Sequence, residues 1–439
     1  MQSAPASSPA DGASEVPRAK LSQQELSAGA TRHQAFLNRQ SGGMRANFKM
    51  RDLSHLDLSG LDLSDADFSG AKLFSARLNG TNLTNANLYG ADLRLANLTG
   101  ATLNRADLRG ACLRGAILSE AFLVEADLRD GTLMHMKRSG EMTSVNYEST
   151  KIMTELTCAT VRKADLTRAR VSNAFVMQTD MTDSVMRGTK FVRANLTNSD
   201  LTGADLQGAD LSDANLTGAK LTGARLTGAQ ITRSRMTNAV LIGAILDEFQ
   251  SSLPELADAV RPRKFEDYGN TIGEILAQHM MWMNSGGKGG RRADLLGYDL
   301  SGQMLAGANL SAAVLQSATL SKADLSEAGL AMADMSLADL RRAKLIGTDL
   351  RGVNMERSTL SGADLSDAKF NPVHIQSGTG HVWRANLRRA RLDGANLRNA
   401  DLRRVNFNEA VLTDADLRGA KLNEADFTGA DKTGAIGLK

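Results

Sequence analysis

The chain is poor in the residues that build disulfide frameworks, metal sites and aromatic cores. Its 439 residues include only two cysteines and six prolines, and aromatic residues make up 4%. Cys112 and Cys158 follow no metal-ligand spacing, so we predict no metal and no cofactor. Two unpaired thiols are typical of a reducing, cytoplasmic compartment. An interior with so few rings must be filled by small and aliphatic side chains.

The chain also lacks an excess of either charge. It carries 52 Lys and Arg residues against 49 Asp and Glu residues, a formal net charge of +3. This balance does not favour the basic stripe of a nucleic-acid-binding protein, and it is not the acidic surface that a DNA mimic needs. Residues 1–20 contain no apolar run, so we predict a disordered tail there rather than a secretory signal or a membrane anchor.

What the sequence has is a leucine at every fifth position. Between residues 194 and 229 leucine recurs seven times at this spacing, starting at Leu196, with Ala or Ser two residues earlier. A step of five would turn successive leucines by about 140° around a helix and would send them to opposite faces of a flat strand. The backbone must therefore turn one corner per repeat, with leucine inside, alanine where the walls crowd, and Gly, Asn or Asp at the turn.

This pattern resembles the pentapeptide-repeat family, whose consensus is A(D/N)LXX, and the resemblance extends over most of the chain. The resemblance implies an all-β solenoid in which four pentapeptides form one square coil and the coils stack as a right-handed quadrilateral β-helix. Each coil of such a solenoid contacts mainly its neighbours. We therefore expect two elongated arms rather than globular domains.

Two segments without the period divide the chain. We predict a tail over 1–20, an N-terminal capping-helix module over 21–46, a first β-helix over 47–246, a helical linker or cap module over 247–292 and a second β-helix over 293–439.

The two helical modules read as copies of one another. Each has a capping box, Ser22 with Glu25 and Thr271 with Glu274, and each ends in Ser-Gly-Gly before the repeats begin. His33 and His279 stand at equivalent places, where we expect them to pack or hydrogen-bond. A further short helix is predicted between Ser252 and Pro262. A helix laid across the end of a β-helix would hide apolar core and unpaired backbone groups.

Irregular segments interrupt both arms. The period across Met134 to Glu155 returns when two residues are omitted, which favours a distorted coil filled by methionines. The alternative is an outward recognition loop carrying Lys137 and Arg138. In the second arm, His374 and His381 flank an interruption with Trp383 close by. Two histidines are too few to specify a metal, so a loop that relieves the coil is preferred over a small ligand pocket.

The strongest charge cluster lies in the second arm and consists of Arg384, Arg388, Arg389, Arg391, Arg398, Arg403 and Arg404. A twenty-residue coil would stack Arg389 on Glu409 and Arg404 on Glu424. We therefore favour a solvent-facing, salt-bridged face, with a contact to an anionic or acidic partner as the alternative.

No group of residues stands out as catalytic, because most acidic residues come directly before the central leucine, an outward position. We predict a non-enzymatic scaffold or protein–protein interaction module that presents flat β-helix faces. The resemblance implies an alternative, a DNA-mimic-type protein that binds and protects DNA gyrase, although such relatives are typically acidic. A third hypothesis is an exported bacterial effector. No helix follows the last repeat, so we expect an open C-terminal coil suited to a homo-oligomer or to a partner strand; nucleic acid and membrane are not expected partners.

Overall fold

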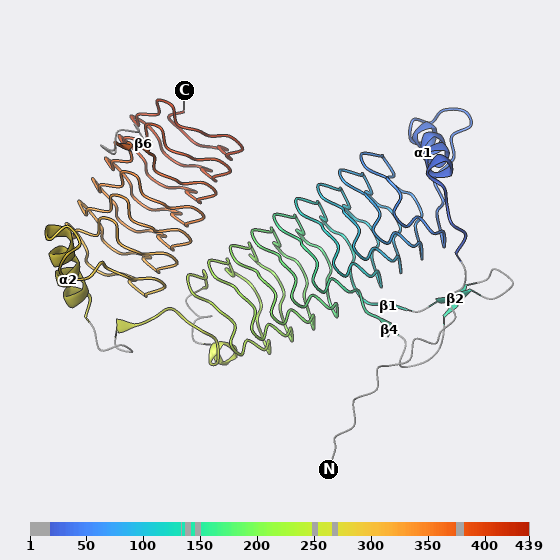
Figure 1. The fold of residues 1–439 in the computed structure, drawn as a ribbon, viewed down its shortest axis with the longest axis horizontal. Coiled ribbons are helices and arrows are strands. Elements are labelled where there is room, and N and C mark those ends of the chain that lie inside the picture. Colours follow the sequence, from blue (N-terminus) through green and yellow to red (C-terminus); the bar gives the residue numbers. More distant parts are fainter. Residues whose placement is uncertain are drawn as a thin grey trace, which may run out of the picture.

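The repeats form two stacks of coils that are joined by a helical connection and lie in a V, with the connection at its apex (Figure 1). A computed structural model describes residues 18–132, 134–136, 142–144, 151–247, 253–265, 271–374 and 382–438. We refer to residues 46–260 as the first stack and to residues 293–438 as the second stack. Within the described residues, neither α-helix combines the length and the apolar character that crossing a membrane would require.

Each coil has four sides, and each side contributes one bridged residue. Asp52, Asp57, Asp62 and Asp67 pair in parallel with the residues twenty positions later. The residue after each bridge donates its backbone N–H to the next coil, as Leu53 does to the Lys72 carbonyl at 2.7 Å. One bridge per side is too short to count as a strand, which is why the named strands all lie in insertions.

The corners explain the consensus. Successive corner residues His55, Gly60 and Asp65 adopt left-handed φ values of 63°, 68° and 62°. Glycine and asparagine tolerate this conformation best. The acidic or amide residue before the leucine fixes the turn, since Asp52 Oδ1 accepts a hydrogen bond from the Ser54 backbone N–H at 2.9 Å. Every repeat position therefore has a local physical role.

The interior contains the predicted side chains. The central leucines, such as Leu53 and Leu206, are 0% exposed, and so are most of the alanines two residues before them. Where Thr replaces Ala, its hydroxyl bonds the backbone of the preceding coil: Thr81 Oγ1 donates to the Leu58 carbonyl at 2.8 Å. Ladders of leucine and alanine thus form one continuous core in each stack.

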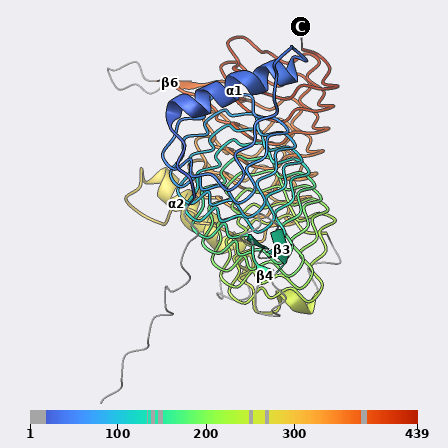
Figure 2. The ribbon, with the colours of Figure 1, turned by 90° about the vertical axis from the view of Figure 1, so that its right-hand side faces the viewer.

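Two α-helices lie against the first coils of the stacks. Helix α1 (Gln23–Leu37) crosses the start of the first stack (Figure 2), and α2 (Ile272–Asn284) packs against the core of the second. Both capping boxes are present. In both modules a histidine Nδ1 accepts a backbone N–H from the first coil at 3.0 Å, His33 from Ala46 and His279 from Ala293.

The connection is less helical than the sequence suggested. The helix expected between Ser252 and Pro262 is a single 3-10 turn, η2 (Pro254–Leu256), within the described part of this segment. Leu256 is buried in the first core, and Val260 still pairs with Val240. The ladder of the first stack therefore runs on to Val260, and Arg263 then pairs with Tyr298 of the second stack.

The distorted coil expected over Met134 to Glu155 is wrong, because the chain leaves the stack there. Strand β1 (Gly131–Thr132) pairs antiparallel with β4 (Lys151–Ile152), and β2 (Met134–Met136) with β3 (Met142–Ser144). Cys112 bridges Glu155, an offset of 43 residues instead of 20. The segment is an antiparallel insertion outside the ladder, and its Lys137 and Arg138 lie outside the described residues.

The second arm contains a smaller insertion. Strand β5 (Val373–His374) pairs antiparallel with β6 (Val382–Trp383), and Asn354 bridges Asn386 across it. The coils before and after this insertion therefore still pair with each other. The interruption is an antiparallel pair of strands outside the ladder rather than a deformed coil.

Candidate functional site

The two stacks touch along a row of corners, which we call the inter-stack seam. Five corner residues of the first stack each oppose one corner residue of the second. The opposing residues are Lys163 and Glu409, Asp183 and Arg389, Gly203 and Arg357, Gly223 and Leu337, and Gly243 and Ser317. Successive members in each row are one coil apart and the two rows run in opposite directions. The arms are therefore the two sides of an antiparallel hairpin of solenoids.

Near the apex the seam depends on glycine. Gly223 has φ +65°, and a Cβ there would lie 2.9 Å from Leu337 Cδ2. At Gly243, where φ is +69°, a Cβ would lie 3.1 Å from the backbone oxygens of Leu337 and Ser317. Only glycine combines this conformation with so close an approach. These two corners let the second stack pack directly on the backbone of the first.

Toward the open end of the V the seam becomes ionic. Asp183 accepts from Arg389 Nη1 at 2.7 Å and is also bonded by Arg357. Asp183 and Arg389 each have only 16% of the side chain exposed. One coil farther out, Lys163 Nζ lies 3.8 Å from Glu409 Oε2. The pairs of Asp183 are largely shielded from water and are therefore stronger than surface pairs, whereas Lys163 and Glu409 are 36% and 42% exposed.

Behind the ionic corners, the faces of the two stacks line a cavity of about 310 Å³. Asp205, Arg225 and Val185 line it from the first stack, and Arg391 and Thr359 from the second. Burial and the nearby Arg391 guanidinium lower the pKa of Arg225 to about 10. Burial also lowers the pKa of Arg391, which lies 3.7 Å from the Asp205 carboxylate. Asp205, expected to face solvent, is instead 9% exposed in this seam.

The arginine cluster predicted from the sequence divides into two groups. Arg389 and Arg391 were expected on a solvent face, but they lie in the seam because the first stack covers that side of the second. Arg389 still stacks on Glu409 at 2.7 Å, and Arg404 on Glu424 at 2.7 Å, as the twenty-residue coil predicted.

The remaining members of the cluster lie outside the seam contacts. Arg388 bonds Glu409 at 3.0 Å, and Arg398 lies 3.9 Å from Asp416. Arg403 pairs with Asp401 at 2.6 Å, and Arg384 is exposed.

A local motif neutralises many other arginines. In the sequence Asp-Leu-Arg, the arginine folds back onto the aspartate two residues before it with two hydrogen bonds, as Arg418 does on Asp416 at 2.9 and 2.6 Å. The same pairing occurs at Arg109 with Asp107 and elsewhere. The sequence reasoning missed this pairing, although the recurring tripeptide was its visible signal.

The other predicted residues are only partly placed. Trp383 is 51% exposed on β6, with its ring against Gly352. His374 belongs to β5, and His381 lies outside the described residues, so the pocket suggested for the two histidines has no described geometry. Among the described residues, no cluster of His, Cys, Asp and Glu is arranged to hold a metal ion.

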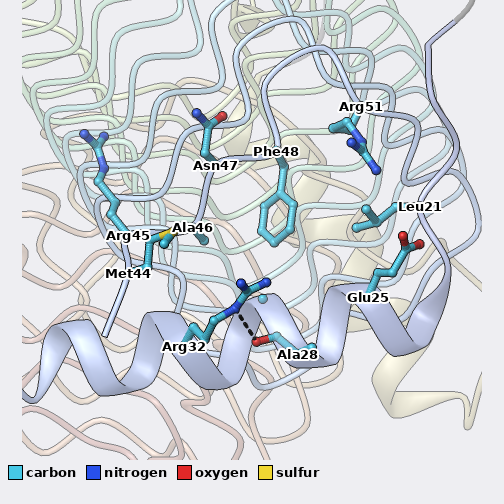
Figure 3. Close-up of a pocket in the computed structure, with 11 residues that line it drawn as sticks. Leu21, Glu25, Ala28, Arg32, Met44, Arg45, Ala46, Asn47, Phe48 and Arg51 are labelled. Carbon is cyan, nitrogen blue, oxygen red and sulfur yellow. Dashed lines mark hydrogen bonds between the residues drawn. The ribbon is translucent and has the colours of Figure 1, made fainter. Parts of the chain in front are cut away.

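A second hollow, of about 350 Å³, lies between α1 and the first coil (Figure 3). Arg32 and Glu25 extend from the helix, and Phe48 and Arg51 face them from the coil. His33, which holds the helix to the coil, is fully buried: its Nε2 lies 2.9 Å from the Ser64 carbonyl.

The comparisons with known proteins agree with the repeat geometry. A profile described as "Pentapeptide repeats" matches residues 44–115, 179–247, 293–330, 333–371 and 384–435, which together exceed half of the chain. The chain belongs to the pentapeptide repeat family. Members of this family form right-handed quadrilateral β-helices. A search of curated protein sequences finds no match.

Several solved structures of pentapeptide repeat proteins are similar. QnrB1, described as a plasmid-mediated fluoroquinolone resistance protein, is 19% identical and aligns over 48% of this chain and 94% of its own, with a TM-score of 0.27. HetL from Nostoc sp. strain PCC 7120, described as involved in heterocyst differentiation regulation, is 22% identical over 92% and 94%, with a TM-score of 0.12. Rfr23 from Cyanothece 51142 is 23% identical over 35% and 90%, with a TM-score of 0.22. Assignment to the pentapeptide repeat family rests on the repeats themselves.

Proposed function

We propose that this pentapeptide repeat protein is a non-enzymatic scaffold that binds another protein on the outer faces of its first stack. The observation that carries the proposal is an exposed apolar patch formed by Leu95, Ile117 and Phe122, which are 56%, 40% and 49% exposed. Most outward positions of the ladder hold Asp, Asn, Arg, Lys or Thr. Large apolar side chains exposed together mark interaction surfaces more often than isolated ones do.

The patch extends around one corner of the stack. Ile117 and Phe122 hold consecutive bridged positions of the same coil. Leu95 covers the preceding corner, since a Cβ on Gly115 would lie 2.8 Å from Leu95 Cδ2. Phe122 shares its ladder with Asp165, Val185 and Asp205, so it lies on the seam-facing side beyond the region that the second stack covers. A partner seated there would reach into the open end of the V.

The arrangement of helices supports a durable scaffold. We infer that α1 and the η2 segment close the two ends of the first stack and that α2 closes the start of the second. Each places apolar side chains against a terminal coil, as Leu26 and Leu256 do. Closed ends prevent edge-to-edge association of the exposed backbone.

The surface charge favours a scaffold over the gyrase-binding alternative. Asp-Leu-Arg pairs cancel acidic groups along the faces, whereas imitation of DNA needs a continuous acidic stripe. At the other end, Leu422 and Phe427 in the last described coils are only partly buried, whereas Leu402 and Phe407 one coil earlier are fully buried. Self-association through this coil is the second role we propose, and light scattering of the purified chain tests it.

Affinity capture from nuclease-treated lysate with matched variants tests the main proposal. Ile117→Asp and Phe122→Asp change outward positions of the patch. Met304→Asp makes the same kind of change at a 76% exposed outward position of the second stack and serves as the control. We expect a protein retained by the parent and by the control to be lost from the two patch variants. Equal capture by all four proteins, or capture of none, would refute this role for the patch.

A further inference from the structure

The cavity between the stacks has more positive than negative charge. Six basic residues line it, Lys163, Arg187, Arg225, Arg357, Arg389 and Arg391, against three acidic residues, Asp183, Asp205 and Glu409. Two of the carboxylates each pair with two arginines: Asp183 with Arg357 and Arg389, and Asp205 with Arg187 and Arg391. Bringing like charges together where several of them are buried is unfavourable unless an anion balances them.

The hydrogen-bond donors in the cavity point to the same conclusion. Within the described residues, the buried Nε and Nη1 atoms of Arg225 have no acceptor. The same is true of Arg357 Nε and Arg389 Nη2, whereas Arg391 Nε lies 3.6 Å from Asp393 Oδ1. Arg225 has no described carboxylate within ion-pair distance, unlike the other three arginines. Buried polar groups in native proteins are nearly always satisfied, so a group of four unsatisfied guanidinium nitrogens beside one cavity indicates a missing acceptor.

We propose that this cavity binds a small multivalent oxyanion of the phosphate class, with pyrophosphate as its simplest representative. Arginine forks match the oxygen geometry of phosphate groups. The volume of about 310 Å³ exceeds what a single phosphate fills, while the lining offers Ser184, Thr359 and glycine but no aromatic ring on which a nucleobase could stack. Because the donors come from both stacks, the bound anion joins the two arms.

Isothermal titration calorimetry on the full chain, with pyrophosphate at constant ionic strength, tests the site. We expect saturable binding to one site in the parent and at least tenfold weaker binding in Arg225→Gln, because two donors and one charge are lost. Arg403→Gln is the matched control. It removes an arginine that, among the described residues, pairs with its local Asp401 outside the cavity, so pyrophosphate affinity should stay unchanged.

A second variant keeps the test independent of any folding defect. Thr359 occupies the repeat position that holds Asp339 one coil earlier, so Thr359→Asp suits the turn and places a carboxylate inside the cavity. We expect it to raise the thermal unfolding temperature without ligand and to abolish pyrophosphate binding. Phosphate, sulfate and ATP are titrated in parallel. Absence of saturable binding, equal affinity of the parent and Arg225→Gln, or tighter binding of sulfate than of pyrophosphate would each overturn the proposal.

Discussion

Asp183 is the residue on which the ionic half of the seam depends. Replacing it by Asn keeps the side-chain shape and suits its corner φ of 60°, but removes the charge that Arg357 and Arg389 share. A hydrogen bond to a charged group contributes about 1.5–3 kcal/mol. The three side chains are 16–21% exposed, so we take the lower part of that range. We expect Asp183→Asn to lower the free energy of unfolding by about 2 kcal/mol, roughly 30-fold in equilibrium constant.

Urea denaturation of Asp183→Asn, Arg389→Gln and the double variant measures this effect as a coupling energy. Asp213→Asn is the matched control, since Asp213 is also a corner residue with φ 58° but pairs with an Arg233 that is 71% exposed. An exposed pair contributes less than about 1 kcal/mol. Equal losses for the two Asn variants, or a coupling energy near zero between Asp183 and Arg389, would show that the seam is not held by these charges.

Three further outcomes follow from single residues. Leu206→Lys places a charge at a fully buried position and should cost several kcal/mol in thermal unfolding, whereas Gln207→Lys at the adjacent outward position should leave the midpoint nearly unchanged. Burial lowers the pKa of His279 below its ordinary 6.5, so the stability that the neutral His279 confers is present above pH 6.5 and is lost as the pH falls below that value. Hydrogen exchange of the α2 amides should become faster below pH 6.5. A rate of exchange that does not depend on pH would contradict this prediction. The hydrogen bonds from Arg418 hold the pKa of Asp416 at about 2, so the contribution of the ionised Asp416 to stability is present above pH 3.8 and is lost as the pH falls toward 2. An NMR titration of Arg418→Gln should show the pKa of Asp416 rising toward 3.8.

Features set within a few residues were predictable from the sequence. The fifth-residue leucine, the corner residues and the capping boxes at Ser22 and Thr271 are each specified by local chemistry, and all appear where the sequence places them. The twenty-residue spacing even predicted individual pairs such as Arg404 with Glu424.

Features that depend on distant parts of the chain were not predictable. Gly223 and Gly243 resemble every other corner glycine, and only the approach of Leu337 and Ser317 distinguishes them. For the same reason Arg389 looked solvent-facing, because one stack gives no sign of what covers it. Nor could the period separate a deformed coil from an insertion at residues 131–153, since omitting two residues restores the count equally well.

The two insertions show how this architecture divides its tasks. Leu113 N–H bonds the Glu155 carbonyl at 2.7 Å, and Met355 N–H bonds that of Asn386 at 2.7 Å, the same spacing as in uninterrupted coils. The free-energy cost of closing a loop, which comes from lost chain entropy, rises by only about 0.6 kcal/mol for each doubling of the loop length. A corner can therefore gain, lose or exchange a segment while the leucine core beneath it stays unchanged. New recognition elements can accumulate on such a chain without a corresponding loss of stability, and the same corners are natural places for grafting designed peptides.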